Sequence, residues 1–273
     1  MTTHAPRPYG PSVRARTVPP ALREFAYWLH RYRRTWRGTV VLNVANPLLF
    51  LTGIGAGLGT LVNDNNSAAL EGLSYLAFLT PGLLAASATQ TAFMDSADPV
   101  HQSVQAKGHY WAANATPLSP VDIFHGHVLF NVFKVALSAT AFTAVAVAFG
   151  AVDAARAPLA VLATLLVGAA FAAPSAAWAV TTRRQSTVLA VLRFGVMPMF
   201  MFSGTFFPLS QLPGWLQPVM QATPLWHGVE LCRTAALGTG TAGGTAVHIG
   251  YLVALMAVGL LAGRRTYQRH LHS

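Results

Sequence analysis

Six apolar segments divide this chain, and each is close to the length that a lipid bilayer requires. A membrane-crossing helix needs about 20 predominantly apolar residues, because its backbone polar groups must all be satisfied within the helix. Hydrophobic residues make up 53% of the chain and charged residues only 10%. We therefore expect an all-α integral membrane protein with six transmembrane helices. They are expected at 39–62, 73–93, 121–150, 158–180, 188–207 and 246–261.

Basic residues gather beside these segments and do not form one continuous surface. Eight of the eighteen Lys and Arg residues precede residue 38, and three more follow the last segment. If both termini lie on one side, the inner segments hold fourteen basic residues and the outer segments two, Arg156 and Arg233. Cytoplasmic loops carry such an excess of positive charge. We expect a multi-pass protein with cytoplasmic N- and C-termini whose net charge of +10 serves contact with membrane lipids and not with nucleic acid.

The first 37 residues contain two different parts. Residues 1–19 have no hydrophobic periodicity and are expected to be a disordered cytoplasmic tail. From Pro20 onward, apolar residues recur at helical spacing and arginines occupy the other face, which predicts an amphipathic helix lying in the membrane interface. It could act as a topogenic anchor or as a lever that touches a cytoplasmic partner. The residues taken to mark it are Phe25, Leu29, Arg33 and Trp36.

Two basic residues, Lys134 and Arg193, fall within or near the ends of expected spans. Charged groups in membrane segments usually mark a function. Arg193 is close enough to the inner end of its span for its side chain to reach the interface, and contact with substrate is the other interpretation. Lys134 lies deeper in the third span. No Asp or Glu falls centrally in a span, which argues against a proton-coupled carrier.

No cluster of side chains indicates catalysis or metal binding. His125 and His127 are two residues apart, so a helix directs them to different faces and they cannot share one ion. Asp95, Asp98 and His101 form the other candidate set, without a cysteine nearby. We expect no catalytic residue and no metal site.

An ATP-binding P-loop, GxxxxGK[ST], is also absent from the sequence. Such a loop places a lysine directly after a glycine. The only two lysines, Lys107 and Lys134, follow Ala106 and Phe133. We therefore expect no cofactor site in this chain, and ATP and Mg²⁺ would be bound by a different subunit.

The stretch 202–233, FSGTFFPLSQLPGWLQPVMQATPLWHGVELCR, has the composition of a chain that leaves the bilayer and turns back toward it. Pro208 and Pro213 interrupt an apolar run, since proline lacks a backbone donor and breaks helices. Trp215 is of a type that favours the membrane interface. Near its end, Glu230 and Arg233 are three residues apart and can pair on one helical face. This pair either neutralises two charges near lipid or takes part in gating.

This stretch resembles the signature region of ABC-2 type transporter permeases, in which F-S-G-x-x-F-P-x-x-x-L-P precedes P-L-x-H-x-x-x-x-x-R. The turn at 116–120, TPLSP, and Asn46-Pro47 at the start of the glycine-rich first span are similar to features of the same family. The nodulation-export and daunorubicin-resistance types are the most similar in character. The matching positions of the signature are Phe202, Ser203, Gly204, Phe207, Pro208, Leu212, Pro213, Pro224, Leu225, His227 and Arg233.

The resemblance implies a bacterial plasma-membrane permease with an N-terminal interfacial helix, a transmembrane domain over 38–265 and a cytoplasmic tail over 266–273. A re-entrant helical hairpin would lie between the fifth and sixth helices on the outer side. The chain would pair with a second copy or a paralogue and with a separate ABC ATP-binding subunit. The residues implied in the hairpin, as an outer gate, are Phe207, Pro208, Pro213, Trp215, Pro224, His227, Glu230 and Arg233.

The resemblance also implies that the segment 101–120 rests on the ATP-binding subunit. The residues implied in this coupling are His101, Gln105, Lys107, Pro117, Leu118 and Ser119. The stretch 95–115 departs from the family pattern, because Pro99, Gly108 and Asn114 occur where a more continuous helix is expected.

The function expected from these observations is the permease subunit of an ATP-driven exporter. The substrate is expected to be amphipathic, drug-like or lipid-linked, such as a glycolipid, because apolar and aromatic residues dominate and no cluster of fixed charge would bind a small ion. A secondary carrier is the first alternative, although no internal repeat supports it. A membrane-embedded lipid-modifying enzyme is the second, and it would need a nucleophile or metal set at the interface.

Overall fold

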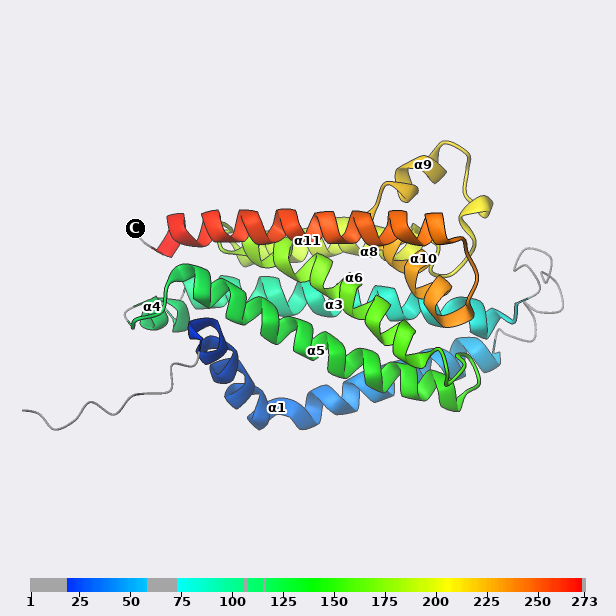
Figure 1. Ribbon diagram of the computed structural model, residues 1–273, viewed down its shortest axis with the longest axis horizontal. Helices are drawn as coiled ribbons and strands as arrows, with labels where there is room; N and C mark the ends of the chain where they lie inside the picture. Colours follow the sequence, from blue (N-terminus) through cyan, green and yellow to red (C-terminus); the bar gives the residue numbers. More distant parts are fainter. Residues whose placement is uncertain (1–18, 58–72, 106–107, 115, 272–273) are drawn as a thin grey trace, which may run out of the picture.

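The computed structural model describes residues 19–57, 73–105, 108–114 and 116–271, and every regular element within them is a helix (Figure 1). The all-α expectation is thus confirmed for this part of the chain. The elements are α1 (Pro20–Phe50), η1 (Leu51–Ala56), α3 (Tyr75–Gln105), α4 (His109–Asn114), α5 (Pro120–Ala148), α6 (Ala157–Ala179), α7 (Gln185–Val191), η2 (Leu192–Val196), α8 (Met197–Phe202), η3 (Leu209–Gln211), α9 (Leu216–Gln221), α10 (Pro224–Leu237) and α11 (Ala242–Leu271).

Four helical stretches in the described residues are long and apolar enough to cross a membrane. They are α5, α6, the stretch Gln185–Phe202 and α11. These correspond to the third, fourth, fifth and sixth expected spans, and the expected bounds of α5 and α6 agree with the observed ones to within two residues. α1 with η1, and α3, do not reach the same hydropathy, so six spans remain a prediction.

α6 is the central helix of the bundle. It packs against α3, α5, α10 and α11. Of its most apolar stretch 61% is buried, against 17% for α11 and 11% for Gln185–Phe202. Small residues permit this packing: a side chain at Gly168 would collide with Val135 of α5, and one at Gly259 of α11 would collide with Pro174 of α6. Close contacts between small residues are the usual means of helix association in membranes.

α1 runs without a break from Pro20 to Phe50 and packs against α5. The expected boundary at 37–38, between an interfacial helix and a first span, is therefore not the end of a helix, although α1 bends along its length in Figure 1. The two helices approach closely at Gly126, where an added Cβ would lie 2.5 Å from the Ala21 carbonyl oxygen and from Glu24 Cβ.

α3 extends well beyond the second expected span. We expected the helix to end near residue 93, but it continues to Gln105 with Pro81 and Pro99 inside it. Packing against neighbouring helices compensates for the missing proline donors. α4 follows directly, so the segment that departs from the family pattern is nevertheless largely helical in the described residues.

The fifth expected span, 188–207, is more irregular than predicted. α7, the π-helical turn η2 and α8 together end at Phe202, and Gly204 then adopts a positive φ of 81°. The left-handed conformation suits glycine, which has no Cβ. The chain continues through η3 and α9 into α10. Figure 1 shows α9 and α10 toward one end of the bundle, and α4, the start of α1 and the C-terminus at the other.

Some expectations fall outside the described residues. They are the disordered tail over 1–18, the end of the first span and the polar loop after it over 58–72, and the coupling residue Lys107. The expected C-terminal tail lies largely inside α11, which includes Arg264, Arg265 and Arg269 and ends at Leu271.

Candidate functional site

A cavity of about 810 Å³ lies between α1, α3, α4 and α5, at the end of the bundle where α4 is found (Figure 1). Its walls combine aromatic rings with acidic, basic and amide side chains. Cavities of this size accommodate small organic ligands. The lining residues are Tyr27, Trp28, Arg31, Tyr32, Thr35, Asp95, Asp98, Pro99, Gln102, Ser103, Gly108, His109, Ala112, His127, Phe130 and Lys134.

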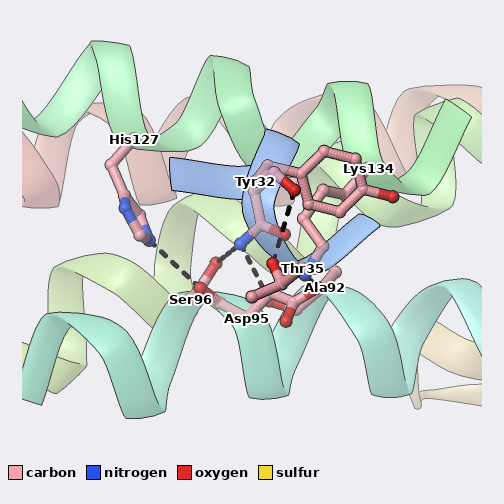
Figure 2. A network of polar contacts seen from close by, with 8 residues as sticks. Tyr32, Thr35, Ala92, Asp95, Ser96, His127 and Lys134 are labelled. Atoms are coloured by element: carbon pink, nitrogen blue, oxygen red, sulfur yellow. Dashed lines mark hydrogen bonds and ion pairs between the residues drawn. The ribbon is translucent and has the colours of Figure 1, made fainter. Parts of the chain in front are cut away.

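An ion pair joins α3 and α5 in the wall of this cavity. Lys134 Nζ lies 2.6 Å from Asp95 Oδ2, and the two side chains are 16% and 27% exposed. Lys134 Nζ also lies 6.0 Å from the centroid of the Tyr32 ring (Figure 2). The pair explains how Lys134 is accommodated in an apolar helix: it is neutralised by a carboxylate from a neighbouring helix, and an isolated charge there would be costly.

Two buried polar side chains of α5 extend this connection. His127 Nε2 donates a hydrogen bond of 3.1 Å to the Asp95 carbonyl oxygen (Figure 2). The amide of Asn131 donates to Ser96 Oγ and, at 3.4 Å, to the Ala92 carbonyl. Because α3 offers both backbone and side-chain acceptors, α5 is held in one rotational position against it.

Glu24 makes the corresponding link between α1 and α4. Its Oε1 accepts hydrogen bonds of 2.7 Å from Trp28 Nε1 and 2.7 Å from His109 Nε2. The residue is only 1% exposed. The imidazole of His109 stacks on the ring of Tyr27 at a centroid distance of 3.6 Å. α4 is thus fastened to α1 by one buried carboxylate and one ring stack.

The sequence analysis missed Glu24, Asp95 and Lys134 as partners in these contacts. One signal was present for the first: Glu24 is the only acidic residue before position 64, in a region with eight arginines. No comparable signal existed for Asp95 with Lys134, because their pairing depends on how α3 and α5 are rotated against each other.

The structure places the six predicted coupling residues in different settings. His101 is buried, and its Nδ1 donates a 2.9 Å hydrogen bond to the Thr182 carbonyl between α6 and α7. Gln105 ends α3, and Lys107 is outside the described residues. Pro117 and Ser119 are exposed and Leu118 is half-buried. The role of this group stays a prediction.

Ser119 has a clear structural task at the start of α5. Its hydroxyl accepts a hydrogen bond from the Asp122 amide, and the Asp122 side chain accepts one from the Ser119 amide. This reciprocal capping box satisfies backbone donors that a helix start leaves free. The turn before α5 is therefore rigidly joined to it.

The four predicted interfacial residues do not line the cavity. Phe25 meets Phe130 and Phe133 of α5 edge-on, with centroid distances of 6.2 and 5.9 Å. Leu29 is half-buried, whereas Arg33 and Trp36 are exposed. Other residues of the same helix line the cavity instead.

The predicted hairpin residues lie at the opposite end of the bundle (Figure 1). Phe207 and Pro208 are half-buried, Pro213 is exposed and Trp215 is 74% exposed. Pro224 begins α10, where its missing amide hydrogen costs nothing. The tip of this region is therefore exposed, whereas the residues at its base are partly buried.

The base of the hairpin is fixed by Arg233. Its Nη1 lies 2.6 Å from Glu230 Oε1, so the expected pair is present. Its Nη2 donates a 2.8 Å hydrogen bond to the Gly204 carbonyl, and its guanidinium lies 4.2 Å from the ring centroid of Phe78 in α3. One side chain thus connects α10, the end of α8 and α3.

His227 of α10 is also buried, against α11. Its Nδ1 lies 2.8 Å from His248 Nδ1, and its ring stacks on Tyr251 at 3.9 Å. Arg193, the other charge expected within a span, is exposed in η2. None of these groups resembles a catalytic constellation.

Apolar helices long enough to cross a membrane, with a polar cavity at one end of their bundle, are features of a membrane transport component. Residues 23–237 match the family described as ABC-2 type transporter. The chain is 30% identical to "Nodulation protein J" of Rhizobium meliloti (strain 1021) over 82% of this chain and 84% of that protein. It is also 30% identical to "Nodulation protein J" of Sinorhizobium fredii, over 87% and 93%. The chain belongs to the ABC-2 type transporter family.

Proposed function

We propose that this chain is the transmembrane permease subunit of an ATP-driven exporter. It would move an amphipathic, drug-like or lipid-linked substrate, such as a glycolipid, out of the cytoplasm or the inner leaflet. A separate ABC subunit would bind ATP and Mg²⁺, and a second permease copy or paralogue would complete the conduit. Membership of the ABC-2 family and the relatives named for nodulation support an exporter permease over a secondary carrier or a lipid-modifying enzyme.

The contact between Glu24 and His109 is the observation that carries this proposal furthest. It joins the basic helix α1 to α4, and α4 lies in the segment that we expect to rest on the ATP-binding subunit. The hydrogen bond from His101 to the Thr182 carbonyl joins the same segment to the turn between α6 and α7. A push on α4 would therefore be transmitted both to α1 and to the stretch Gln185–Phe202.

The proposed topology has six spans and cytoplasmic termini. The second half of α1 with η1, and α3, would supply the first two spans beside the four apolar stretches. The arginines of α1 at positions 23, 31, 33, 34 and 37 are exposed, as expected of a helix that lies in the membrane interface.

In this topology the hairpin between α8 and α11 would lie on the outer side and act as a re-entrant gate. The contacts of Arg233 with Gly204 and Phe78 support a hairpin whose base moves together with α3 and α8. The exposed tip around Trp215 would face the exit of the conduit.

Site-directed cross-linking tests the proposed contact. With the ATP-binding subunit co-expressed, a cysteine at Gln105 or Lys107 should be captured by that subunit, and a cysteine at Trp215 should not. The native Cys232 is buried and gives a low background. Labelling of Gln105→Cys and Lys107→Cys only from outside the cell would invert the topology and remove the coupling role.

A further inference from the structure

The cavity between α1, α3, α4 and α5 holds charges that its own residues leave unmatched. Lys134 and Asp95 neutralise each other at 2.6 Å. Within the described residues, Asp98 accepts hydrogen bonds from two neutral amides, those of Gln102 at 2.8 Å and Gln185 at 2.7 Å. No cation in the described part of the chain forms an ion pair with it. Among these residues the Asp98 carboxylate thus has amide donors but no cationic partner.

Arg31 is the matching unpaired cation of the same cavity. Its guanidinium lies over the ring of Trp28, 5.5 Å from the centroid, and no carboxylate of the described residues is within ion-pair distance. Guanidinium groups bind phosphate with a fixed geometry of several donors. One wall of the cavity can therefore accept a cation and another an anion.

His127 adds an acceptor to the wall that carries the carboxylates. Its Nε2 donates to the Asp95 carbonyl, so in the neutral ring Nδ1 carries the lone pair. The side chain is 1% exposed, and Nδ1 has no hydrogen-bond partner among the described residues. A buried acceptor without a donor is unfavourable. Because Nδ1 is itself buried behind the cavity wall, the polar contacts open to a ligand are those of Asp98 and Arg31.

We propose that this cavity binds the phosphoethanolamine headgroup of a membrane lipid. The primary ammonium would lie near Asp98, and the phosphate near Arg31. A primary ammonium can donate hydrogen bonds to the Asp98 carboxylate, whereas the quaternary ammonium of choline has no N–H.

A lipid is the proposed source because five lining residues belong to α1, which also carries the exposed arginines. This step rests on the interfacial position that the proposed function gives to α1. A helix in that position places the cavity at the depth of the headgroups, and its volume of about 810 Å³ leaves room for the glycerol portion.

Native mass spectrometry of the purified full-length chain tests the proposal with lipids of identical acyl chains. Phosphatidylethanolamine should bind with an apparent affinity about tenfold above that of phosphatidylcholine and phosphatidylglycerol, as expected for one added charge-assisted contact. Asp98→Asn and Arg31→Gln should each remove most of that preference. The matched controls Asp153→Asn and Arg265→Gln change exposed residues outside the cavity and should retain it.

The proposal would be overturned by equal binding of ethanolamine and choline lipids, by a preference that survives both Asp98→Asn and Arg31→Gln, or by stronger binding of a neutral glycolipid with the same chains. Binding of soluble phosphoethanolamine without binding of the lipid would also overturn it. Melting temperatures near that of the wild type establish that the variants are folded. If the lipid preference is absent but ATP-dependent coupling is intact, the lipid site is wrong and the exporter assignment stands. If the lipid preference is present but ATP-dependent coupling is absent, the exporter assignment is wrong and the lipid site stands.

Discussion

The Glu24 carboxylate of α1 accepts a 2.7 Å hydrogen bond from His109 Nε2 of α4, across 85 positions of the sequence. Since Glu24 is buried, the contact is shielded from water and is stronger than a similar pair at the surface. It makes α1 and α4 one mechanical unit at the end of the bundle where we place the ATP-binding subunit.

The Glu24 contact should be sensitive to truncation and tolerant of an isosteric change. Glu24→Ala removes the acceptor for both Trp28 and His109 and should destabilise the chain by about 1–3 kcal/mol. Glu24→Gln keeps an oxygen in the same place and should retain most of the coupling. The measurement is substrate-stimulated ATP hydrolysis by the complex, with the melting temperature recorded in parallel.

His30→Ala is the matched control on the same helix, since His30 is exposed. A positioning role predicts that Glu24→Gln restores stimulated hydrolysis while Glu24→Ala and His109→Ala lower it. If all three variants behave as the wild type does, α1 and α4 do not transmit motion through this contact.

Gly126 should be intolerant of a side chain. An alanine Cβ would lie 2.5 Å from the Ala21 carbonyl oxygen, so α1 would have to move away from α5. Forced repacking of this kind costs about 1–3 kcal/mol. Gly250→Ala in α11 is the control, because nothing lies within 4 Å of its added Cβ. A lower melting temperature is expected for Gly126→Ala only, and equal melting temperatures would contradict the close crossing of α1 and α5.

Replacing both Asp95 and Lys134 should cost less stability than the two single replacements together. Either Asp95→Asn or Lys134→Gln leaves one charge unpaired in a partly shielded position. The expected loss is about 1–3 kcal/mol, as for a polar group left without its partner. The double variant should be more stable than the sum of the single losses predicts, because no unpaired charge remains. Additive losses in thermal unfolding would show that the two charges do not interact.

Arg233 should control the position of the hairpin. Arg233→Ala removes the contacts with Glu230, Gly204 and Phe78 together, whereas Glu230→Gln leaves the last two in place. We expect Arg233→Ala to increase the reactivity of a cysteine placed at Leu212, which is buried in the wild type, and Glu230→Gln to have a smaller effect. Arg269→Ala, an exposed arginine at the other end, is the control. Unchanged reactivity in Arg233→Ala would mean that the hairpin base is held by other contacts.

The sequence predicted best the helices whose ends carry local signals, such as a capping residue or a proline in the first turn. α5 begins where Ser119 and Pro120 provide a cap and a first-turn proline, and α6 begins after Arg156 with Pro158 in its first turn. Both were expected within two residues. In each case the apolar run and its boundary signal lie in the same short stretch of sequence, so no tertiary information is needed.

The sequence could not predict features that depend on neighbouring helices. Pro99 argued for a loop, yet packing keeps α3 helical to Gln105. The helical pattern of α1 gave Glu24 no role, although it contacts His109 from a buried position. The cavity itself was not foreseen, because its walls come from four helices whose relative rotation is set only by packing.

In the proposed exporter this chain moves the substrate, and a separate subunit hydrolyses ATP and supplies the energy. ATP hydrolysis by the purified chain in lipid nanodiscs, measured alone and then with its co-expressed ATP-binding subunit, tests this division of roles most directly. We expect no hydrolysis by the chain alone and vanadate-sensitive hydrolysis by the complex. Robust hydrolysis by the isolated chain, or a complex that never forms, would contradict it.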